Sequence, residues 1–264
     1  MPQMIATHSY GNACIQIYAS EEALGVAAAK QTADLIRAVI AQSGRARIVV
    51  ATGNSQLALI GALVRQEAID WKSVDVFHMD EYVGISRNHP ASFRYWIRTR
   101  VEEKVRPGSM EYIEGDASDL DAEMARYARL LAAGPIDLAF VGIGENGHIA
   151  FNDPAVADFE DPLMVKRVVL DEACRRQQVG EGHFKDVDAV PREAITLTCP
   201  ALFRAQAWVC SVPDARKAVA VRSALEGPIS TACPGSLVRR HPNTTVYLDT
   251  HSAALLEFAL AKGR

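Results

Sequence analysis

The amino-acid sequence predicts an α/β protein with a doubly wound, mostly parallel sheet that helices cover on both faces. Short apolar runs of strand length alternate along the chain with longer segments of helical periodicity, and residues 138–141 are one such run. This alternation is typical of parallel sheets, because each crossover connection places a helix on a face. Small polar residues follow three of the strands directly. Open α/β sheets bind their ligands at those strand ends.

Bulk composition is that of an ordinary soluble globular protein. The chain has 264 residues, of which 49% are hydrophobic and 23% are charged. We expect a single domain over residues 1–264. The formal net charge of −4 without a long basic run argues against general nucleic-acid binding. A local basic pocket for an anionic metabolite remains compatible with this balance.

Cysteine usage and terminal patterns indicate a protein of the cytoplasm. The five cysteines are odd in number, widely spaced and free of any C-x-x-C pair, which favours reduced thiols over a disulfide or zinc framework. Since no cluster has plausible metal-ligand spacing, we expect neither a metal nor another cofactor. We also expect no signal peptide and no membrane span, because no apolar run reaches about 18 residues.

The first half of the chain alternates strands with helices. Strands are expected at residues 15–18, 47–51, 74–79 and 138–141, and helices at 20–41, 57–67, 92–101 and 118–133. Ser20 and Ser92 are suitable N-cap residues for two of these helices. Acidic residues in the first turns of the helices at 20–41 and 118–133 complement the helix dipole.

The second half continues the same pattern. Strands are expected at residues 165–170, 194–198, 208–211 and 245–248, and helices at 213–226 and 252–261. Residues 174–184 form a polar segment with two glycines. This segment is compatible with a mobile lid over a site and equally with a surface helix and turn.

Residues 137–154 form the most informative stretch. A buried strand is followed by Gly142, Gly144 and Gly147, and glycines let the backbone approach a ligand closely. His148 and Asp153 come next. Their proximity to the glycines favours a catalytic role, although a lone histidine near a turn can be purely structural. The glycine spacing also fits a dinucleotide fingerprint, which would need a following helix and a later acidic residue.

The turn after the strand at 47–51 suits an anion. Thr52, Gly53, Asn54 and Ser55 lead into a helix, whose free N–H groups and dipole favour a phosphate. The alternative is an ordinary turn with Asn54 or Ser55 as the N-cap.

Two adjacent carboxylates follow the strand at 74–79. Asp80 and Glu81 would point to opposite sides if the extended geometry persists. One would then face a cleft while the other forms a structural ion pair. The alternative is a solvated turn.

Three motifs together resemble the glucosamine-6-phosphate deaminase (isomerase) family, which is related to the 6-phosphogluconolactonases. They are T-G-N-S at 52–55, M-D-E-Y-V-G at 79–84 and G-I-G-E-N-G-H-I-A-F-N-D-P at 142–154. The last of these motifs differs from the corresponding loop of the lactonases, which continues G-H-T-A-S-L-F-P. The resemblance extends over residues 48–249. It implies conversion of an amino-sugar 6-phosphate into a ketose 6-phosphate and ammonia.

The resemblance also implies roles for individual residues. Asp80 is the base at C2, and His148, oriented by Asp153, moves the ring-opening proton. Lys217, which could otherwise be an exposed helix lysine, contacts the phosphate, as does Arg175 or Arg176. The expected catalytic residues are Asp80, Asn146, His148 and Asp153, and the expected substrate-binding residues are Thr52, Gly53, Asn54, Ser55, Gly144, Gly147, Arg176 and Lys217.

Three positions depart from the family pattern. Gln56 stands where proline is common, and Asn146 stands where some members have an aspartate that can take a proton. Asp153 replaces the usual glutamate, which withdraws the carboxylate by roughly 1 Å. Galactosamine 6-phosphate is therefore a second candidate substrate. Two different functions are also compatible with this sequence, namely that of a 6-phosphogluconolactonase and that of a non-catalytic sugar-phosphate sensor. Whether the chain forms a homo-oligomer is left open.

Overall fold

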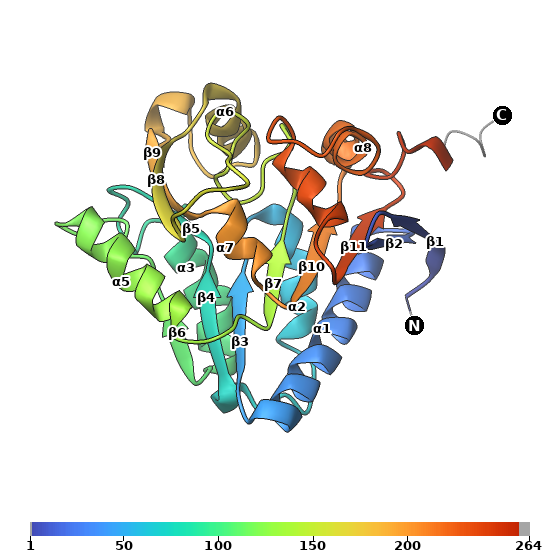
Figure 1. Ribbon diagram of the computed structural model, residues 1–264, viewed down its shortest axis with the longest axis horizontal. Helices are drawn as coiled ribbons and strands as arrows, with labels where there is room; N and C mark the ends of the chain where they lie inside the picture. The colour runs from blue at the N-terminus through green and yellow to red at the C-terminus, as the bar shows by residue number, and fades with distance from the viewer. Residues whose placement is uncertain (1, 259–264) are drawn as a thin grey trace.

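The central sheet of the computed structural model, which describes residues 2–258, has eight strands in the order β1-β2-β11-β10-β7-β3-β4-β6 (Figure 1). Its strands are β1 (Met4–Tyr10), β2 (Ala13–Tyr18), β3 (Ala46–Val50), β4 (Val74–His78), β6 (Ser109–Glu111), β7 (Leu138–Val141), β10 (Ala207–Val212) and β11 (Thr244–Asp249). All neighbours from β2 to β6 are parallel, and only β1 is antiparallel to its partner. The expected doubly wound, mostly parallel sheet is confirmed.

A second sheet was not expected from the sequence. It contains β5 (Asp80–Tyr82), β9 (Glu193–Leu197) and β8 (Val165–Val169), all antiparallel. The chain passes almost directly from β4 into β5, and Leu197 N–H donates to the carbonyl of Met79 at this junction (2.8 Å). Asp80 therefore lies where the two sheets meet.

Helices lie around the two sheets, and Ser20 and Ser92 cap two of them as the sequence predicts. They are α1 (Glu21–Ser43), α2 (Leu57–Leu63), α3 (Phe93–Ile97), α4 (Glu103–Val105), α5 (Leu120–Ala132), α6 (Glu172–Gly180), α7 (Cys199–Phe203) and α8 (Ala218–Glu226). Ser20 accepts a hydrogen bond from Ala23 N–H at the start of α1. Gly44, with φ of 77°, ends that helix in the left-handed conformation that glycine tolerates.

Four helix boundaries differ from the predictions. The helix expected at 57–67 ends at Leu63, and the one expected at 92–101 continues after α3 as a π-helical turn, Arg98–Glu102. The helix expected at 213–226 opens with the 3₁₀ turn η5 (Ala215–Lys217). At 252–261, residues 251–256 form turns because Asp249 binds the N–H groups of the next residues, and residues 259–261 lie outside the described range.

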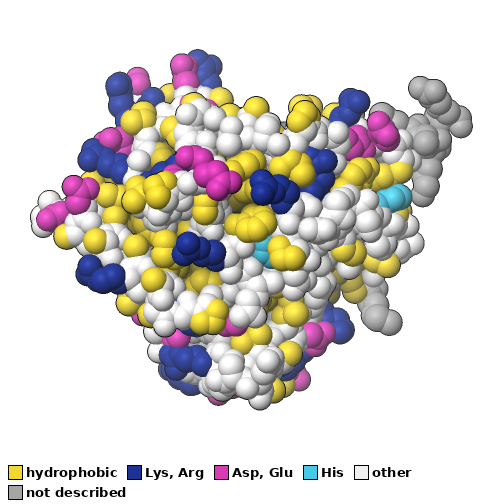
Figure 2. All heavy atoms as spheres, viewed as in Figure 1, with side chains coloured by type: hydrophobic (Ala, Val, Ile, Leu, Met, Phe, Trp, Pro, Cys, Tyr) yellow, Lys and Arg dark blue, Asp and Glu magenta, His cyan; other side chains and the backbone are white. Residues whose placement is uncertain are grey.

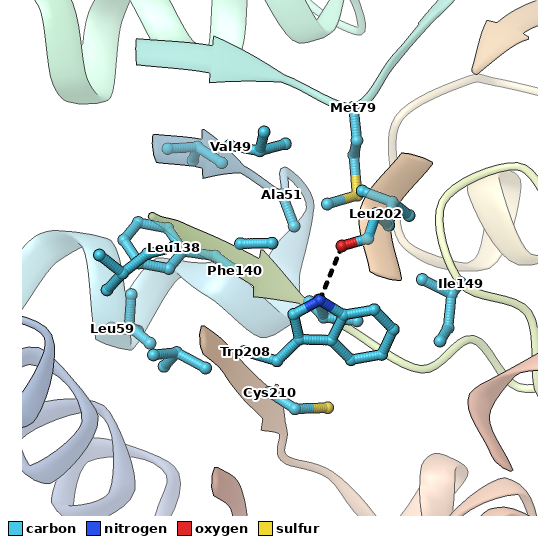
Figure 3. Packing of buried hydrophobic residues seen from close by; sticks show 14 of the residues in the cluster. Val49, Ala51, Leu59, Met79, Leu138, Phe140, Ile149, Leu202, Trp208 and Cys210 are labelled. Carbon is cyan, nitrogen blue, oxygen red and sulfur yellow. Dashed lines mark hydrogen bonds between the residues drawn. The ribbon is translucent and has the colours of Figure 1, made fainter. Parts of the chain in front are cut away.

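The core fixes the strands whose ends carry the site. Trp208 on β10 is buried, and its indole N–H donates to the carbonyl of Leu202 in α7 at 2.9 Å (Figure 3). Such a bond satisfies the one polar group of a buried indole. On the face of the central sheet that carries the Trp208 side chain, α5 and α7 lie against side chains of β3 and β7. On the other face α1 and α2 pack together. The strands are therefore held from both sides.

The surface view shows charges of both signs over one face of the molecule (Figure 2). Lysine and arginine side chains alternate with acidic ones there instead of forming one continuous basic stripe. Within residues 2–258, no helix combines the length and the apolar character needed to cross a bilayer.

Candidate active site

A pocket lies at the carboxyl ends of β3, β4, β7 and β10. Residues that follow these strands line it: 51–55 after β3, Met79 and Asp80 after β4, 142–144 and His148 after β7, and Lys217 after β10. The other lining residues are Phe93, Ala150, Phe151, Gln177, Gln178 and Glu181. The prediction that Asp80 and His148 line one cavity with the 52–55 turn is confirmed. Parallel strands bring these distant segments together because their carboxyl ends share one sheet edge.

The turn after β3 is held open towards the pocket by Gln56. Gly53 has φ of 93°, and the 3₁₀ turn η1 (Asn54–Gln56) follows it. The buried Gln56 amide donates to Ser55 Oγ (3.1 Å), and Ser211 Oγ donates to the Ser55 carbonyl (3.0 Å). Side-chain hydrogen bonds therefore brace the turn at the position where the family commonly has proline.

Asp80 and Glu81 occupy opposite sides of β5, so the solvated-turn alternative is wrong. Asp80 lines the pocket and is only 6% exposed, while Glu81 is fully buried behind it. Burial raises the pKa of Asp80 well above its usual value, and the neighbouring Glu81 charge raises it further.

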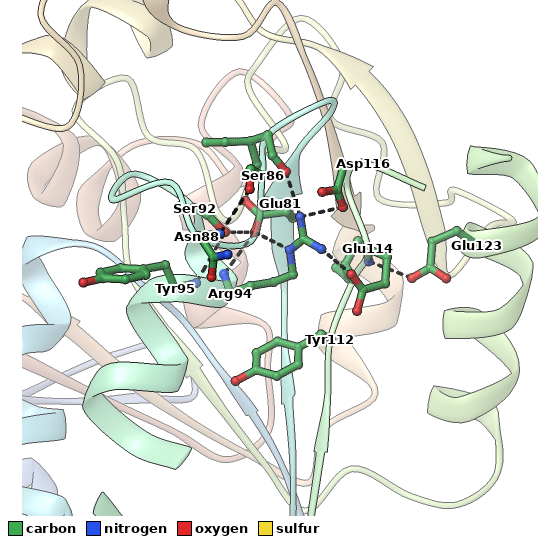
Figure 4. A network of polar contacts seen from close by, with 12 residues as sticks. Glu81, Ser86, Asn88, Ser92, Arg94, Tyr95, Tyr112, Glu114, Asp116 and Glu123 are labelled. Atoms are coloured by element: carbon green, nitrogen blue, oxygen red, sulfur yellow. Dashed lines mark hydrogen bonds and ion pairs between the residues drawn. The ribbon is translucent and has the colours of Figure 1, made fainter. Parts of the chain in front are cut away.

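A buried network anchors Glu81 and with it the position of Asp80 (Figure 4). Glu81 accepts hydrogen bonds from Ser92 Oγ (2.6 Å) and from the Arg94 main-chain N–H (3.0 Å) and Nε (3.3 Å). The Arg94 guanidinium also pairs with Glu114 and with Asp116. Burial raises the pKa of Glu81, and the hydrogen bonds from Ser92 and Arg94 oppose that rise. The network joins β5 to α3.

Two glycines of the loop after β7 have different functions. Gly144 must lack a side chain because the His148 ring lies against its Cα, where a Cβ would overlap the imidazole. Gly147 has φ of 87°, and a Cβ there would approach Cys233 Sγ to 2.8 Å. Gly147 does not line the pocket, so its expected contact with substrate is not met. Its role is to pack the loop against the segment after α8.

Asp153 reaches His148 despite its shorter side chain. Its Oδ1 lies 3.0 Å from His148 Nδ1 and accepts a hydrogen bond from Asn146 Nδ2 (2.9 Å). Asn146 Oδ1 in turn accepts from the His148 main-chain N–H (3.0 Å). Burial alone would raise the pKa of Asp153, but the adjacent His148 and Asn146 hold it below its usual value. Asn146 itself lies behind the pair and does not line the pocket.

Of the expected cations, only Lys217 lies in the pocket. Its side chain is 7% exposed, so the exposed-lysine alternative is wrong. Burial lowers the pKa of Lys217, and the charge of Glu181 opposes the change. The Arg176 side chain is 70% exposed, pairs with Glu172 and lies outside the pocket lining. Arg175 donates to the carbonyls of Val187 and Val190, and neither arginine lines the pocket where the phosphate contact was expected.

The sequence left residues 174–184 open between a lid over a site and a surface helix and turn, and none of the three residues that this segment contributes to the pocket was expected there. Gln177, Gln178 and Glu181 line the pocket, and Asn54 Nδ2 donates to the Glu181 carbonyl (3.3 Å). Tyr82 Oη donates to Gln178 Oε1 (2.8 Å). The segment 174–184 thus lies over the site. The polar residues of this segment were the sequence feature that indicated its position over the site.

A cluster beside the pocket has the composition of a possible metal site. His148, Asp153 and Cys174 each offer a ligand atom, and these atoms lie within 4.8 Å of one another. Burial raises the pKa of the Cys174 thiol, and the Asp153 charge adds to the rise. A protonated thiol donates to a carboxylate and is a poor metal ligand. The chemistry of this set fits a hydrogen-bonded cluster, and metal-independent catalysis stays a prediction.

The fold and the pocket together define a protein of the class that acts on phosphorylated sugars. Residues 19–247 match the family model described as glucosamine-6-phosphate isomerases/6-phosphogluconolactonase. The chain belongs to this family.

Relatives and solved structures agree with that assignment. The glucosamine-6-phosphate deaminase of Bacillus cytotoxicus is 32% identical over 94% of this chain and 90% of its own length. That of Bacillus thuringiensis is 35% identical over 86% of this chain and 84% of its own. A solved monomeric glucosamine-6-phosphate deaminase superposes with a TM-score of 0.83 at 30% identity, covering 91% of this chain and 99% of that one. A 6-phosphogluconolactonase from Shewanella baltica (TM-score 0.73, 19% identity, 94% and 100% coverage) shares the fold.

Proposed function

We propose that this chain is an amino-sugar 6-phosphate deaminase that converts glucosamine 6-phosphate and water into a ketose 6-phosphate and ammonia. The observation that carries the proposal is that Asp80 and His148 line one pocket with a buried lysine and an anion-binding turn. The identity to relatives named glucosamine-6-phosphate deaminase over most of the chain supports the same activity.

The phosphate end of the substrate binds at the turn after β3. The 52–55 turn, which leads into η1, and the Lys217 side chain line this part of the pocket. Together they suit a phosphate ester. Anchoring this end places the sugar carbons beneath Asp80 and His148.

Ring opening needs a group that passes a proton between the ring oxygen and the C1 hydroxyl. His148 faces the pocket and is held by Asp153 at 3.0 Å. The carboxylate orients the imidazole, while Asn146 donates a hydrogen bond to the carboxylate. Asn146 and Asp153 act through His148 and are positioning residues.

Asp80 then removes the proton from C2 of the open-chain aldehyde, giving an enolate that carries the amino group. Protonation at C1 by the same carboxyl group gives an imine at C2. Water adds to this imine and ammonia leaves. A carboxylate with a raised pKa is a stronger base than an ordinary one, so the buried position of Asp80 suits this step.

Lactone hydrolysis is less well supported. It needs an activated water but no base at C2, and it gives no reason for a buried carboxyl group at the position of Asp80. The lactonase similarity lies at 19% identity and concerns the fold. A non-catalytic sensor would need no acid–base pair.

The deciding experiment is ammonia release from purified protein. We expect turnover of glucosamine 6-phosphate, with galactosamine 6-phosphate as the epimer control and 6-phosphogluconolactone as the hydrolase control. Lactone hydrolysis without ammonia release, or binding of the amino sugar without turnover, would contradict the proposal.

We also infer a cytoplasmic location, since the five cysteines of the described chain are all free. The sequence left open whether the chain assembles into a homo-oligomer. Mass measurement in solution decides it.

A further inference from the structure

The phosphate end of the pocket contains a carboxylate. Glu181 follows α6 directly, and its side chain is 9% exposed beside that of Lys217, which is 7% exposed. The Glu181 Oε1 atom lies 3.7 Å from Lys217 Nζ. Both residues line the pocket that also contains the 52–55 turn.

Several contacts hold this carboxylate in place. Gln177 Nε2 donates to Glu181 Oε1 (2.7 Å), and His183 Nε2 lies 3.4 Å from Oε2. Asn54, a residue of the anion-binding turn, donates to the main-chain carbonyl of Glu181. These hydrogen bonds connect the end of α6 to the 52–55 turn, so Glu181 is a fixed part of the pocket and not a surface side chain that happens to lie near it.

The charges of the pocket lining explain why this contact matters. Lys217 is the one lysine or arginine among the described lining residues, and Asp80 and Glu181 are the acids. With Glu181 in place, the single positive charge is already neutralised. A phosphate dianion would enter next to a buried carboxylate, and like charges at short range in a poorly solvated site repel strongly.

On the basis of the function proposed above, we propose that Glu181 is a substrate-site residue that occupies the anion subsite on Lys217 until a phosphate displaces it. The phosphate and the Glu181 carboxylate then compete for one ammonium group. Apparent affinity falls by the fraction of protein in which the subsite is free. Glu181 thereby weakens the binding of free phosphate and of a sugar phosphate by the same factor, so tight binding depends on the further contacts that the sugar supplies.

The test compares Glu181→Gln with Glu172→Gln. Glutamine keeps the size of Glu181 and its acceptor oxygen for Gln177 but removes the charge. Glu172 lies at the other end of α6, is 67% exposed and pairs with Arg176, so its variant makes the same charge change outside the pocket. Calorimetric Kd values for inorganic phosphate are measured for both variants and the unaltered protein, together with KM for glucosamine 6-phosphate.

We expect Glu181→Gln to bind inorganic phosphate about tenfold more tightly and to lower KM by a similar factor. Glu172→Gln should stay within about twofold of the unaltered protein. Unchanged or weaker phosphate binding by a folded Glu181→Gln protein would overturn the proposal. Glu181→Ala is the second variant if glutamine prevents folding, and it should change Kd in the same direction.

Phosphate binding requires no turnover, so the two proposals fail separately. If no amino-sugar phosphate releases ammonia, the proposed activity is wrong while the ratio of phosphate Kd values still decides the role of Glu181. If ammonia is released and the Kd ratio is one, only the role of Glu181 is wrong.

Discussion

Asp80 shows how one residue acquires its chemistry from its surroundings. Its side chain faces the pocket, and the burial that raises its pKa comes from the junction of the two sheets. Its neighbour Glu81 faces the other way and forms hydrogen bonds with Ser92 and Arg94. Two adjacent carboxyl groups therefore have separate surroundings, one in the pocket and one in the scaffold.

Replacing Asp80 with asparagine should remove the base while keeping its shape. We expect kcat for ammonia release to fall by about 10²–10⁴-fold, the usual contribution of a positioned acid–base group. Steady-state kinetics with glucosamine 6-phosphate measure the change. Asp34→Asn, at an exposed carboxylate in α1, is the control. Normal turnover by Asp80→Asn would show that another group is the base.

The same substitution should stabilise the fold at neutral pH. Because burial raises the pKa of Asp80, the folded chain binds this proton more tightly than the unfolded chain. The contribution of this proton to the free energy of unfolding is fully present below about pH 3.9, the pKa of the carboxyl group in the unfolded chain. It is lost as the pH rises towards the pKa of Asp80 in the folded chain. Asparagine never ionises, so Asp80→Asn should melt roughly 2–4 °C higher at pH 7.5, the shift expected for about 1 kcal/mol.

This advantage should shrink near pH 4.5, where Asp80 stays protonated in the folded chain. Calorimetric melting of both proteins at the two pH values measures it. A variant that melts lower than the unaltered protein at pH 7.5 would mean that the Asp80 carboxylate stabilises the fold.

Individual residues also show which parts of the candidate site could be predicted from the sequence. Asp80 and His148 follow strands of the central sheet, so their convergence was predictable from a parallel sheet. The position of Lys217 was expected only from the family resemblance. Glu181 and Gln177 follow no such rule. They reach the pocket because α6 lies across it, and that position depends on contacts with residues distant in sequence, such as Asn54.

At the scale of elements, α3 and β5 are joined by the buried Glu81–Arg94 pair, in which both side chains are at most 2% exposed. Removing one partner of such a pair leaves an uncompensated buried charge. Because β5 carries Asp80, the pair also supports the site. This contact was foreseen only as one of two outcomes for the adjacent carboxylates.

Arg94→Met should therefore destabilise the protein by about 3–5 kcal/mol, measured by urea unfolding. Arg167→Met breaks the Arg167–Glu193 pair, whose side chains are 47% and 34% exposed, and should cost less than about 1 kcal/mol. Similar losses in the two variants would contradict the structural role given to the buried pair.

The sequence did not predict which strands pair with one another. Residues 165–170 and 194–198 were expected as strands and form β8 and β9, but in a separate antiparallel sheet. An apolar run indicates an extended backbone and carries no information about its hydrogen-bonding partner. β1 was missed because it is an edge strand with a mixed, largely exposed pattern.

At the scale of the whole molecule, the pocket joins segments from both sheets and from α6. Residues after β3, β4, β7 and β10 line it, and β5 of the second sheet supplies Asp80. A ligand in this pocket contacts parts of the chain that separate on unfolding. Binding should therefore stabilise the entire fold and not one element.

Glucosamine 6-phosphate at about 100 times its Kd should stabilise the protein by about 2.7 kcal/mol, which corresponds to a rise in melting temperature of roughly 5–10 °C. Because Lys217 is the proposed phosphate contact, the Lys217→Met protein should lose most of this rise at the same ligand concentration. Lys185→Met changes a lysine that is 83% exposed and should keep the full rise. Thermal melting with Asp80→Asn as the background avoids turnover during the scan. Equal ligand-induced shifts in the Lys217 and Lys185 variants would place the phosphate elsewhere, and the assignment of the anion-binding end would then be wrong even if ammonia release were confirmed.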